Sequence, residues 1–325
     1  MQTAQLTVLI SCAGRRVELI QCFREVAARM GLRLRVVATD TNPTLSAACH
    51  AADVAVEVPH SSAPSFAASM LAVCREHEVN LVVPTIDAEL PALAEAKASF
   101  AAAGVWLLVS SPSVVGLAAD KFTTAMTLAA LGVVTPRTLR LKDYQENPAA
   151  LAWPVIIKPV SGSSSYGVVR PQTQAEAIAV SDKQEMIAQE KWMGREYTVN
   201  VFFDVQSRVR CIVPHERIEV RAGEVSKGIT RRMPALDDVA KKLSQALLGI
   251  TGPMCFQSIV NNLGECAVFE INARFGGGYP LAHRAGARFT QWLLEDACGL
   301  PSSANNDWKE GVTMLRYDST VFIDG

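Results

Sequence analysis

Four polar residues in the last quarter of the chain have the types and spacing of a metal site. Gln257 lies before a turn at residues 261–264, and Glu270, Asn272 and Arg274 follow it. The alternating runs on both sides predict an antiparallel strand pair, in which Glu270 and Asn272 share one face. One carboxylate and two amides offer oxygen ligands with little charge, which suits a Mg²⁺ or Mn²⁺ ion that phosphates also hold.

Arg274 adds a permanent positive charge directly after this set. It is a candidate to stabilise charge on a transferring phosphoryl group. Three glycines at residues 276–278 then permit close approach of the backbone to a ligand. The alternative is a hairpin with a solvated polar face and a flexible loop, which explains each residue alone better than all of them together.

A second stretch joins a lysine to a loop of small residues. Residues 153–159 predict a strand that carries Lys158, and the loop SGSSSYG leads to a returning strand at 168–170. Such a flap can close over phosphates with its backbone N–H groups and hydroxyls, while Lys158 neutralises charge. The predicted contacts are Lys158, Ser163, Ser164, Ser165 and Gly167. The Walker A pattern is absent, and a plain hairpin with a Gly/Ser tip is the alternative.

Lys121 opens a predicted helix that runs to about Leu131. A lysine in the first turn opposes the helix dipole, and a bound anion would explain it. A simple surface lysine is the alternative.

The stretch EKWMGRE at residues 190–196 combines carboxylates with an apolar pair. A carboxylate such as Glu196 suits a vicinal diol, and the pair Trp192 and Met193 suits a flat base. An ordinary exposed strand acid is the alternative for Glu196.

The elements around these residues begin with a parallel sheet. Short apolar runs near residues 6–10, 33–39, 54–58, 81–83 and 105–109 alternate with helical patterns, which predicts a Rossmann-like fold. Only Gly14 stands where the dinucleotide fingerprint G-x-G-x-x-G is required, so NAD binding is not expected. Polar residues at the strand ends are candidates for a substrate cleft, with loop polarity or helix capping as the alternative. They are Arg15, Asp40, Thr85 and Asp87.

Composition describes a globular chain of two or three domains. It has 325 residues, of which 49% are hydrophobic and 19% charged, and a net charge of -1 that gives no pull toward nucleic acid or anionic membrane. The 8 cysteines form no C-x-x-C pair and predict reduced thiols in a cytoplasmic protein. The uncharged stretch 98–119 is broken by glycines and a Ser-Pro turn, so we expect no membrane span.

Taken in chain order, these features resemble the ATP-grasp superfamily. Gln257 and the E-x-N-x-R ending are most similar to the large-subunit branch of carbamoyl-phosphate synthase. The resemblance implies an α/β fold with a Rossmann-like pre-ATP-grasp domain, followed by an ATP-grasp fold of two α+β subdomains. The expected ranges are 1–115 for the first domain, 116–192 for the small subdomain with the flap, and 193–325 for the C-terminal subdomain with the metal site.

The same resemblance implies roles for individual residues. Lys121 and Lys158 would neutralise the polyphosphate of ATP, and Lys227 would reach its terminal phosphate from a loop. The nucleoside would be held by the backbone at Lys191 and Met193, with Glu190 and Trp192 nearby and Glu196 at the ribose hydroxyls.

The expected activity is an ADP-forming ligase that joins a small carboxylate to an amine through an acylphosphate. Carbamoyl-phosphate synthase large subunits carry two such units and this chain carries one, which argues against carbamoyl-phosphate synthesis. A kinase-like enzyme that stops at a phosphorylated product and a non-catalytic nucleotide-binding module are the alternatives. The partners expected are small molecules, with a homodimer as a family-level expectation; the sequence names neither the carboxylate nor the amine.

Overall fold

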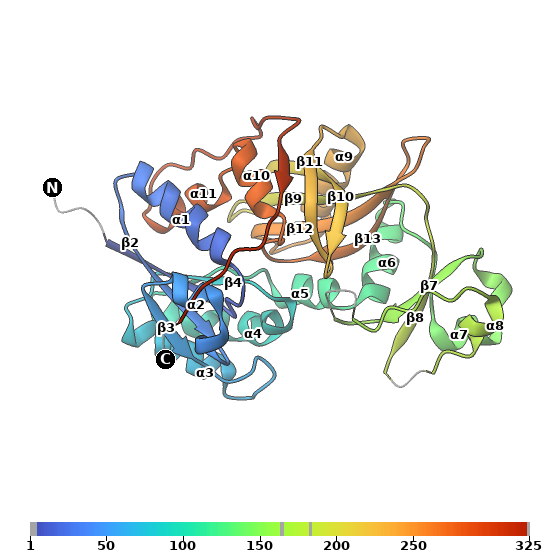
Figure 1. Ribbon diagram of the computed structural model, residues 1–325, viewed down its shortest axis with the longest axis horizontal. Coiled ribbons are helices and arrows are strands. Elements are labelled where there is room, and N and C mark those ends of the chain that lie inside the picture. Colours follow the sequence, from blue (N-terminus) through green and yellow to red (C-terminus); the bar gives the residue numbers. More distant parts are fainter. Residues whose placement is uncertain (1–4, 163–165, 182–183, 324–325) are drawn as a thin grey trace.

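The computed structural model describes residues 5–162, 166–181 and 184–323. Its strands form three sheets, of five, three and six strands. In Figure 1 the N-terminal part is blue, the small three-stranded part is green at the right, and the six-stranded part is yellow to red at the top. The three sheets fall in the three expected residue ranges, and the domain boundaries stay predictions.

The first sheet is parallel throughout, with the order β3-β2-β1-β4-β5. Its strands are β1 (Gln5–Ser11), β2 (Arg33–Asp40), β3 (Val54–Glu57), β4 (Leu81–Pro84) and β5 (Trp106–Leu107). Its helices are α1 (Val17–Arg29), α2 (Ala47–Ala51), α3 (Phe66–Glu76), α4 (Leu90–Ala102) and α5 (Pro112–Ala119). This confirms the Rossmann-like prediction and puts the switch point, where such sheets bind ligands, between β1 and β4.

The second sheet is antiparallel, with the order β6-β8-β7. The elements of this part are α6 (Lys121–Ala130), β6 (Thr138–Arg140), α7 (Leu141–Glu146), β7 (Val155–Pro159), α8 (Gln174–Ile178) and β8 (Met186–Glu190). The returning strand expected at 168–170 is reduced to one bridge between Ile157 and Val169.

The third sheet has the order β13-β12-β9-β10-β11-β14. Its strands are β9 (Arg195–Phe203), β10 (Val209–Arg221), β11 (Glu224–Thr230), β12 (Gly252–Val260), β13 (Cys266–Asn272) and β14 (Thr313–Leu315), and its helices are α9 (Pro234–Ala246), α10 (Tyr279–Ala285) and α11 (Phe289–Ala297). The sequence also favours a turn at residues 223–228, the loop expected to carry Lys227; this is wrong, because Ala222 and Gly223, both with positive φ, already reverse the chain and Lys227 lies in β11. A closing strand, which the apolar run at 321–323 also suggests, does not form.

The metal strand β13 carries a β-bulge at Phe269. Gln257 pairs with Glu270 and Ser258 pairs with Val268, which leaves Phe269 without a partner. A bulge turns two successive side chains the same way. Val268 and Ile271 therefore both enter the core, while Phe269 and Glu270 both line a cavity.

Two large apolar clusters each contain residues from both the first and the third sheet. On one side α1 packs against α10 and α11, where the rings of Phe23 and Phe275 meet edge to face at 6.4 Å. The three-stranded part has a separate cluster, which contains Leu141, Tyr144 and Ile157. All eight cysteines are free thiols. Within the described ranges, no helix is long and apolar enough to cross a membrane.

Candidate functional site

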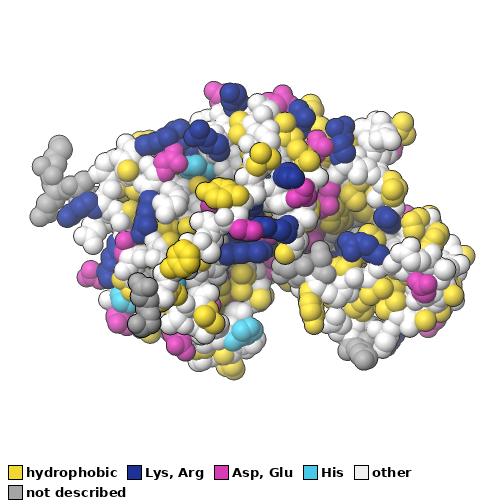
Figure 2. All heavy atoms as spheres, viewed as in Figure 1, with side chains coloured by type: hydrophobic (Ala, Val, Ile, Leu, Met, Phe, Trp, Pro, Cys, Tyr) yellow, Lys and Arg dark blue, Asp and Glu magenta, His cyan; other side chains and the backbone are white. Residues whose placement is uncertain are grey.

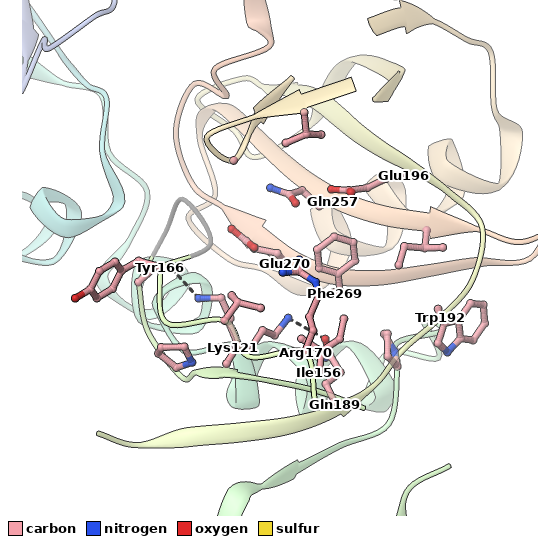
Figure 3. A pocket seen from close by; sticks show the side chains of 18 of the residues that line it. Lys121, Ile156, Tyr166, Arg170, Gln189, Trp192, Glu196, Gln257, Phe269 and Glu270 are labelled. Atoms are coloured by element: carbon pink, nitrogen blue, oxygen red, sulfur yellow. Dashed lines mark hydrogen bonds between the residues drawn. The ribbon is translucent and has the colours of Figure 1, made fainter. Parts of the chain in front are cut away.

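A cavity of about 300 Å³ lies between the three-stranded and six-stranded sheets, and we name it the first cavity. Figure 3 shows Glu196, Gln257 and Glu270 along one side, on the large sheet, and Lys121 and Gln189 on the other. Seven predicted site residues that are far apart in the sequence thus come together here: Lys121, Lys158, Glu190, Trp192, Glu196, Gln257 and Glu270.

Lys158 lies in the wall of the first cavity that β7 supplies, and only 7% of the residue is exposed. Its ammonium donates to Oε1 of Gln189 at 2.8 Å, and Gln189 in turn donates to Thr138 at 2.8 Å. Burial lowers the pKa of Lys158 to about 8, although Glu270 opposes this shift. The ammonium also lies 5.3 Å from the ring centre of Phe269, across the cavity. Among the described residues Gln189 is the one hydrogen-bond partner of this ammonium, and such a buried cation is suited to receive an anion.

Lys121 begins α6 and also lines the first cavity. Asp120 caps this helix by accepting from the Thr123 N–H at 2.7 Å, which offsets the unfavourable first-turn lysine. The Lys121 ammonium donates to the Gly162 carbonyl at 2.7 Å and so reaches the start of the predicted flap. Ser163, Ser164 and Ser165 lie outside the described residues.

Gly167 takes a positive φ of 72°, and a side chain there would collide with Pro159. Gly167 is absent from the described wall of the first cavity, whereas its neighbours Tyr166 and Val168 line it. The predicted contact therefore shifts to these neighbours.

The connector after β8 borders the far end of the first cavity. Trp192 and Glu190 line it, and Glu190 accepts from the Ala152 N–H at 2.9 Å. The Lys191 N–H already donates to Pro154 O at 2.9 Å, so this donor is used within the protein. Met193 is 69% exposed and borders a separate shallow pocket with Leu263. Of the predicted base contacts, Glu190 and Trp192 are the ones that face the cavity.

Two of the predicted metal ligands, Gln257 and Glu270, line the first cavity, and all three, with Asn272, line the neighbouring second cavity. Gln257 and Glu270 pair directly across β12 and β13, and the Asn272 amide donates to Glu270 at 3.2 Å. Among the described residues, no group of three His, Cys, Asp or Glu side chains could cage a metal. A set with one carboxylate and two amides instead fits an ion that phosphate oxygens also hold.

Arg274 is held by contacts within the protein, although its buried Nε has no hydrogen-bond partner among the described residues. It forms an ion pair with Asp87 and donates to Asn272 Oδ1 at 3.0 Å and to Phe275 O at 2.9 Å. Burial opposes its charge, yet the Asp87 carboxylate raises the pKa of Arg274 above its ordinary value. Arg274 does not line the first cavity but a neighbouring one. Its position therefore suits it to orient Asn272, to which it donates.

This second cavity, of about 120 Å³, lies at the switch point of the first sheet. Thr85 and Asp87, which follow β4, line it as the strand-end argument predicts, whereas Arg16 lines it in place of the predicted Arg15. Asp40 has a different task, because it accepts the Gly14 N–H at 2.9 Å and holds the turn before α1. The first and second cavities share part of their wall: Arg217, Gly223, Gln257 and Glu270 line both.

From the sequence, Arg217 is a candidate to bind a substrate carboxylate or phosphate, with solvated surface charge as the favoured alternative, and the structure buries it. Only 7% of its side chain is exposed. It pairs with Glu196 at 3.0 Å and donates to Thr198 at 3.1 Å and to Gly223 O at 3.0 Å. Its position in an alternating strand was the available signal. Lys227, by contrast, lies in β11 and pairs with Glu219 at 2.7 Å, outside both cavities.

Comparisons with known proteins agree with this architecture. Residues 8–108 match the family model "PylC-like, N-terminal domain", and residues 118–278 match the ATP-grasp domain. A D-alanine–D-alanine ligase of Pseudomonas entomophila (strain L48) is 28% identical over 165 residues, 47% of this chain and 51% of the relative. The chain therefore spans about half the length of the curated relatives it matches.

Solved structures show the same fold at low identity. The biotin carboxylase domain of Hydrogenobacter thermophilus 2-oxoglutarate carboxylase, a dimer with MgADP, ADP and bicarbonate, gives a TM-score of 0.72 at 15% identity over 92% of this chain and 71% of that one. An L-amino acid ligase from Bacillus licheniformis gives 0.69 at 21% identity over 93% and 76%. The chain belongs to the ATP-grasp superfamily, with a PylC-like domain ahead of its ATP-grasp domain.

Proposed function

We propose that this chain is an ATP-dependent, ADP-forming ligase that joins a small carboxylic acid or amino acid to an amine. One observation carries the proposal: the predicted metal ligands Gln257 and Glu270 line the wall shared by the first and second cavities. A terminal phosphate held at this wall from the first cavity would face a carboxylate in the second. Ligases of this kind are among the relatives described above.

In this proposal the nucleotide occupies the first cavity. Trp192 and Glu190 border the base, and Glu196 accepts from the ribose hydroxyls. Lys121 and Lys158 neutralise the phosphates. Gln257, Glu270 and Asn272 would hold Mg²⁺ (or Mn²⁺), which draws charge from the phosphate oxygens. The Asn272 oxygen still has a lone pair for this purpose, since Arg274 uses only one.

The reaction then proceeds in two steps. The substrate carboxylate attacks the γ-phosphorus, the bond to ADP breaks, and an acylphosphate forms. An amine attacks the acyl carbon, phosphate leaves, and the amine nitrogen gives up its proton. The chain assists by positioning and by charge, so no side chain needs to be a nucleophile. Arg217, at the shared wall, is suited to contact the transferred phosphoryl group.

The proposal also includes a homodimer and a cytoplasmic location. The biotin carboxylase relative was solved as a dimer, which supports the expected homodimer. The free thiols support a cytoplasmic location.

Nucleotide product analysis tests the proposed activity. Purified protein, Mg²⁺ and ATP are incubated with pooled carboxylates and amino acids, beside Glu270→Gln. We expect ADP and phosphate only with a pool and only in the wild type. A phosphorylated product without any amine requirement would identify a kinase, AMP would contradict the acylphosphate route, and Mg·ATP binding without turnover in any pool would favour a binding module.

A further inference from the structure

A large pocket of about 470 Å³ adjoins the second cavity, and we name it the outer pocket. The two share Arg16, Glu224, Val225, Gly276 and Gly277. The outer pocket lies between the start of α1, the β10–β11 hairpin and the segment after β14. Figure 1 shows this last segment, in dark red, descending from β14 in front of the N-terminal sheet. Of the strand-end residues predicted for a substrate cleft, Arg15 is the one that lines this pocket.

Three arginines converge in the outer pocket on one carboxylate. Glu224 pairs with Arg316 at 2.8 Å, with Arg16 at 2.9 Å and with Arg15 at 3.5 Å. Burial would raise the pKa of Glu224, but Arg16, Arg316 and Arg15 outweigh it and lower the pKa to about 2. The carboxylate is therefore ionised at any physiological pH, and its charge is shared among three cations.

Positive charge remains in excess when all charged side chains of the outer pocket are counted. Glu18 contacts Arg316 at 3.7 Å and Asp318 pairs with Arg221, so four arginines face three carboxylates. Arg15 makes the longest of the three contacts to Glu224, and 64% of its side chain is exposed. Figure 2 shows dark blue side chains with acidic ones among them near the middle of this face.

The first turn of α1 adds donors to the same place. Residues 15–19 line the outer pocket. Within the described part of the chain, the N–H groups of Val17 and Glu18 have no backbone acceptor. Unpaired N–H groups at a helix start favour an anion, and here they lie beside the cationic excess.

We propose that the outer pocket binds a second anionic group, a carboxylate or a phosphate, of the substrate whose reactive carboxylate lies in the second cavity. This inference rests on the proposed function, because it takes the wall shared with the first cavity as the place of phosphoryl transfer. Arg15 and Arg16 supply the contacts from the N-terminal domain, and Arg316 supplies them from the C-terminal segment. The substrate class is thus a compound with two anionic groups.

Matched pairs of probes test this directly by binding. Calorimetry compares succinate, glutarate and adipate with their monoamides, and O-phospho-L-serine with L-serine, in the presence of Mg²⁺ and a non-hydrolysable ATP analogue. We expect the doubly anionic member of at least one pair to bind about ten-fold tighter or more, the range of a charge-assisted hydrogen bond. The dicarboxylate and phosphoserine arms distinguish a carboxylate from a phosphate.

Arg15→Gln should reduce this preference to about three-fold or less, because one of the cationic contacts is lost. Because Arg15 is exposed, we expect the Arg15→Gln variant to fold as the wild type does. Arg24→Gln is the matched control: Arg24 lies on α1, the helix that follows Arg15, and pairs with Asp53 outside the outer pocket. Equal binding of acid and amide, no saturable binding of any probe, or a preference that survives Arg15→Gln would overturn the proposal. Mg·ATP is titrated separately, so its failure to bind would count against the proposed function itself.

Discussion

The three-stranded and six-stranded sheets face each other across the first cavity, but they are supported differently. The six-stranded sheet shares two apolar clusters with the N-terminal sheet. The three-stranded part has its own small cluster. It is joined to the large sheet through the connector at Gly194, where a side chain would come within 2.2 Å of Val260 O. Lys121 and Lys158 of the three-stranded part thus face the side-chain oxygens of Gln257 and Glu270 on the six-stranded sheet, which is the more firmly anchored of the two.

This difference suggests a division of labour. Glu270, Asn272 and Arg274 lie on the anchored side, where geometry must stay fixed for the chemistry. Lys158 lies on the separately packed side, which we expect to close on the nucleotide as a unit. Phe269 and Lys158 form one contact between the two sides. The following predictions test this division, from the largest expected effect to the smallest.

Glu270→Gln should lower ADP formation by about 1,000-fold or more, because an anchored metal ligand contributes several kcal/mol at the transition state. The measurement is ADP release in the pooled-substrate assay. Glu265→Gln, in the exposed turn before β13, is the control and should keep wild-type turnover. A Glu270→Gln protein with full activity would remove Glu270 from the site.

Leu141→Ala and Leu293→Ala compare the two kinds of core. Both leucines are fully buried, the first in the separate cluster and the second in a shared one. Each change should cost about 2–5 kcal/mol of local or global stability. In hydrogen exchange, Leu141→Ala should lose protection chiefly within residues 138–190, and Leu293→Ala across the rest of the chain. Loss in β9–β13 with Leu141→Ala would contradict an independent small part.

Arg217→Gln should weaken binding of a non-hydrolysable ATP analogue by about 100-fold, close to 2.7 kcal/mol, and binding of AMP much less. The reason is that Arg217 lines the wall shared by the first and second cavities, where the proposal places the terminal phosphate. Calorimetry with AMP, ADP and the ATP analogue measures this, with exposed Arg231→Gln as the control. Equal losses for all three nucleotides would mean that Arg217 acts only through Glu196 at the ribose.

The affinity for Mg·ATP should fall about ten-fold between pH 7 and pH 9, because Lys158 with a pKa of about 8 is mostly charged at the first pH and mostly neutral at the second. Only the ammonium form neutralises phosphate, so binding weakens as pH rises. Calorimetry at both pH values measures the effect. In Lys158→Met the slope should disappear; an unchanged slope would assign the titration to another group.

Lys227→Met should change Mg·ATP affinity less than about two-fold, the size expected for an exposed ion pair. The same titration is used. A loss near that of Lys158→Met would mean that Lys227 leaves Glu219 for the nucleotide on closure, and would extend the moving side to the β10–β11 hairpin.

Local pattern was sufficient for much of the fold and of the candidate site. The short apolar runs predicted the parallel sheet, and alternation put Glu270 and Asn272 on one face. Solvated charge was the favoured interpretation of Arg217, because its partners Glu196 and Thr198 lie on another strand and local pattern does not reveal them. Arg274 is joined to Asp87 across 187 residues of sequence, so only the folded chain reveals that this arginine is already engaged.

Turn chemistry caused the error at Lys227. Gly223 and Gly228 suggested a loop between them, but Ala222 and Gly223 complete the reversal and Gly228 pairs within β11. The strand ladder overrode the glycine signal. The bulge at Phe269 was equally hidden, because the sequence around it alternates without interruption.

That bulge has a consequence for anyone who would transplant this site. In a regular strand, an aromatic ring for the lysine and an acid for the metal could not occupy adjacent positions and face the same way. The unpaired residue is what permits both. A designer who copied only the Glu-x-Asn spacing into a regular hairpin would obtain the ligands without the ring. A transplanted site must therefore include the β-bulge, in which β13 has one more residue than the paired segment of β12.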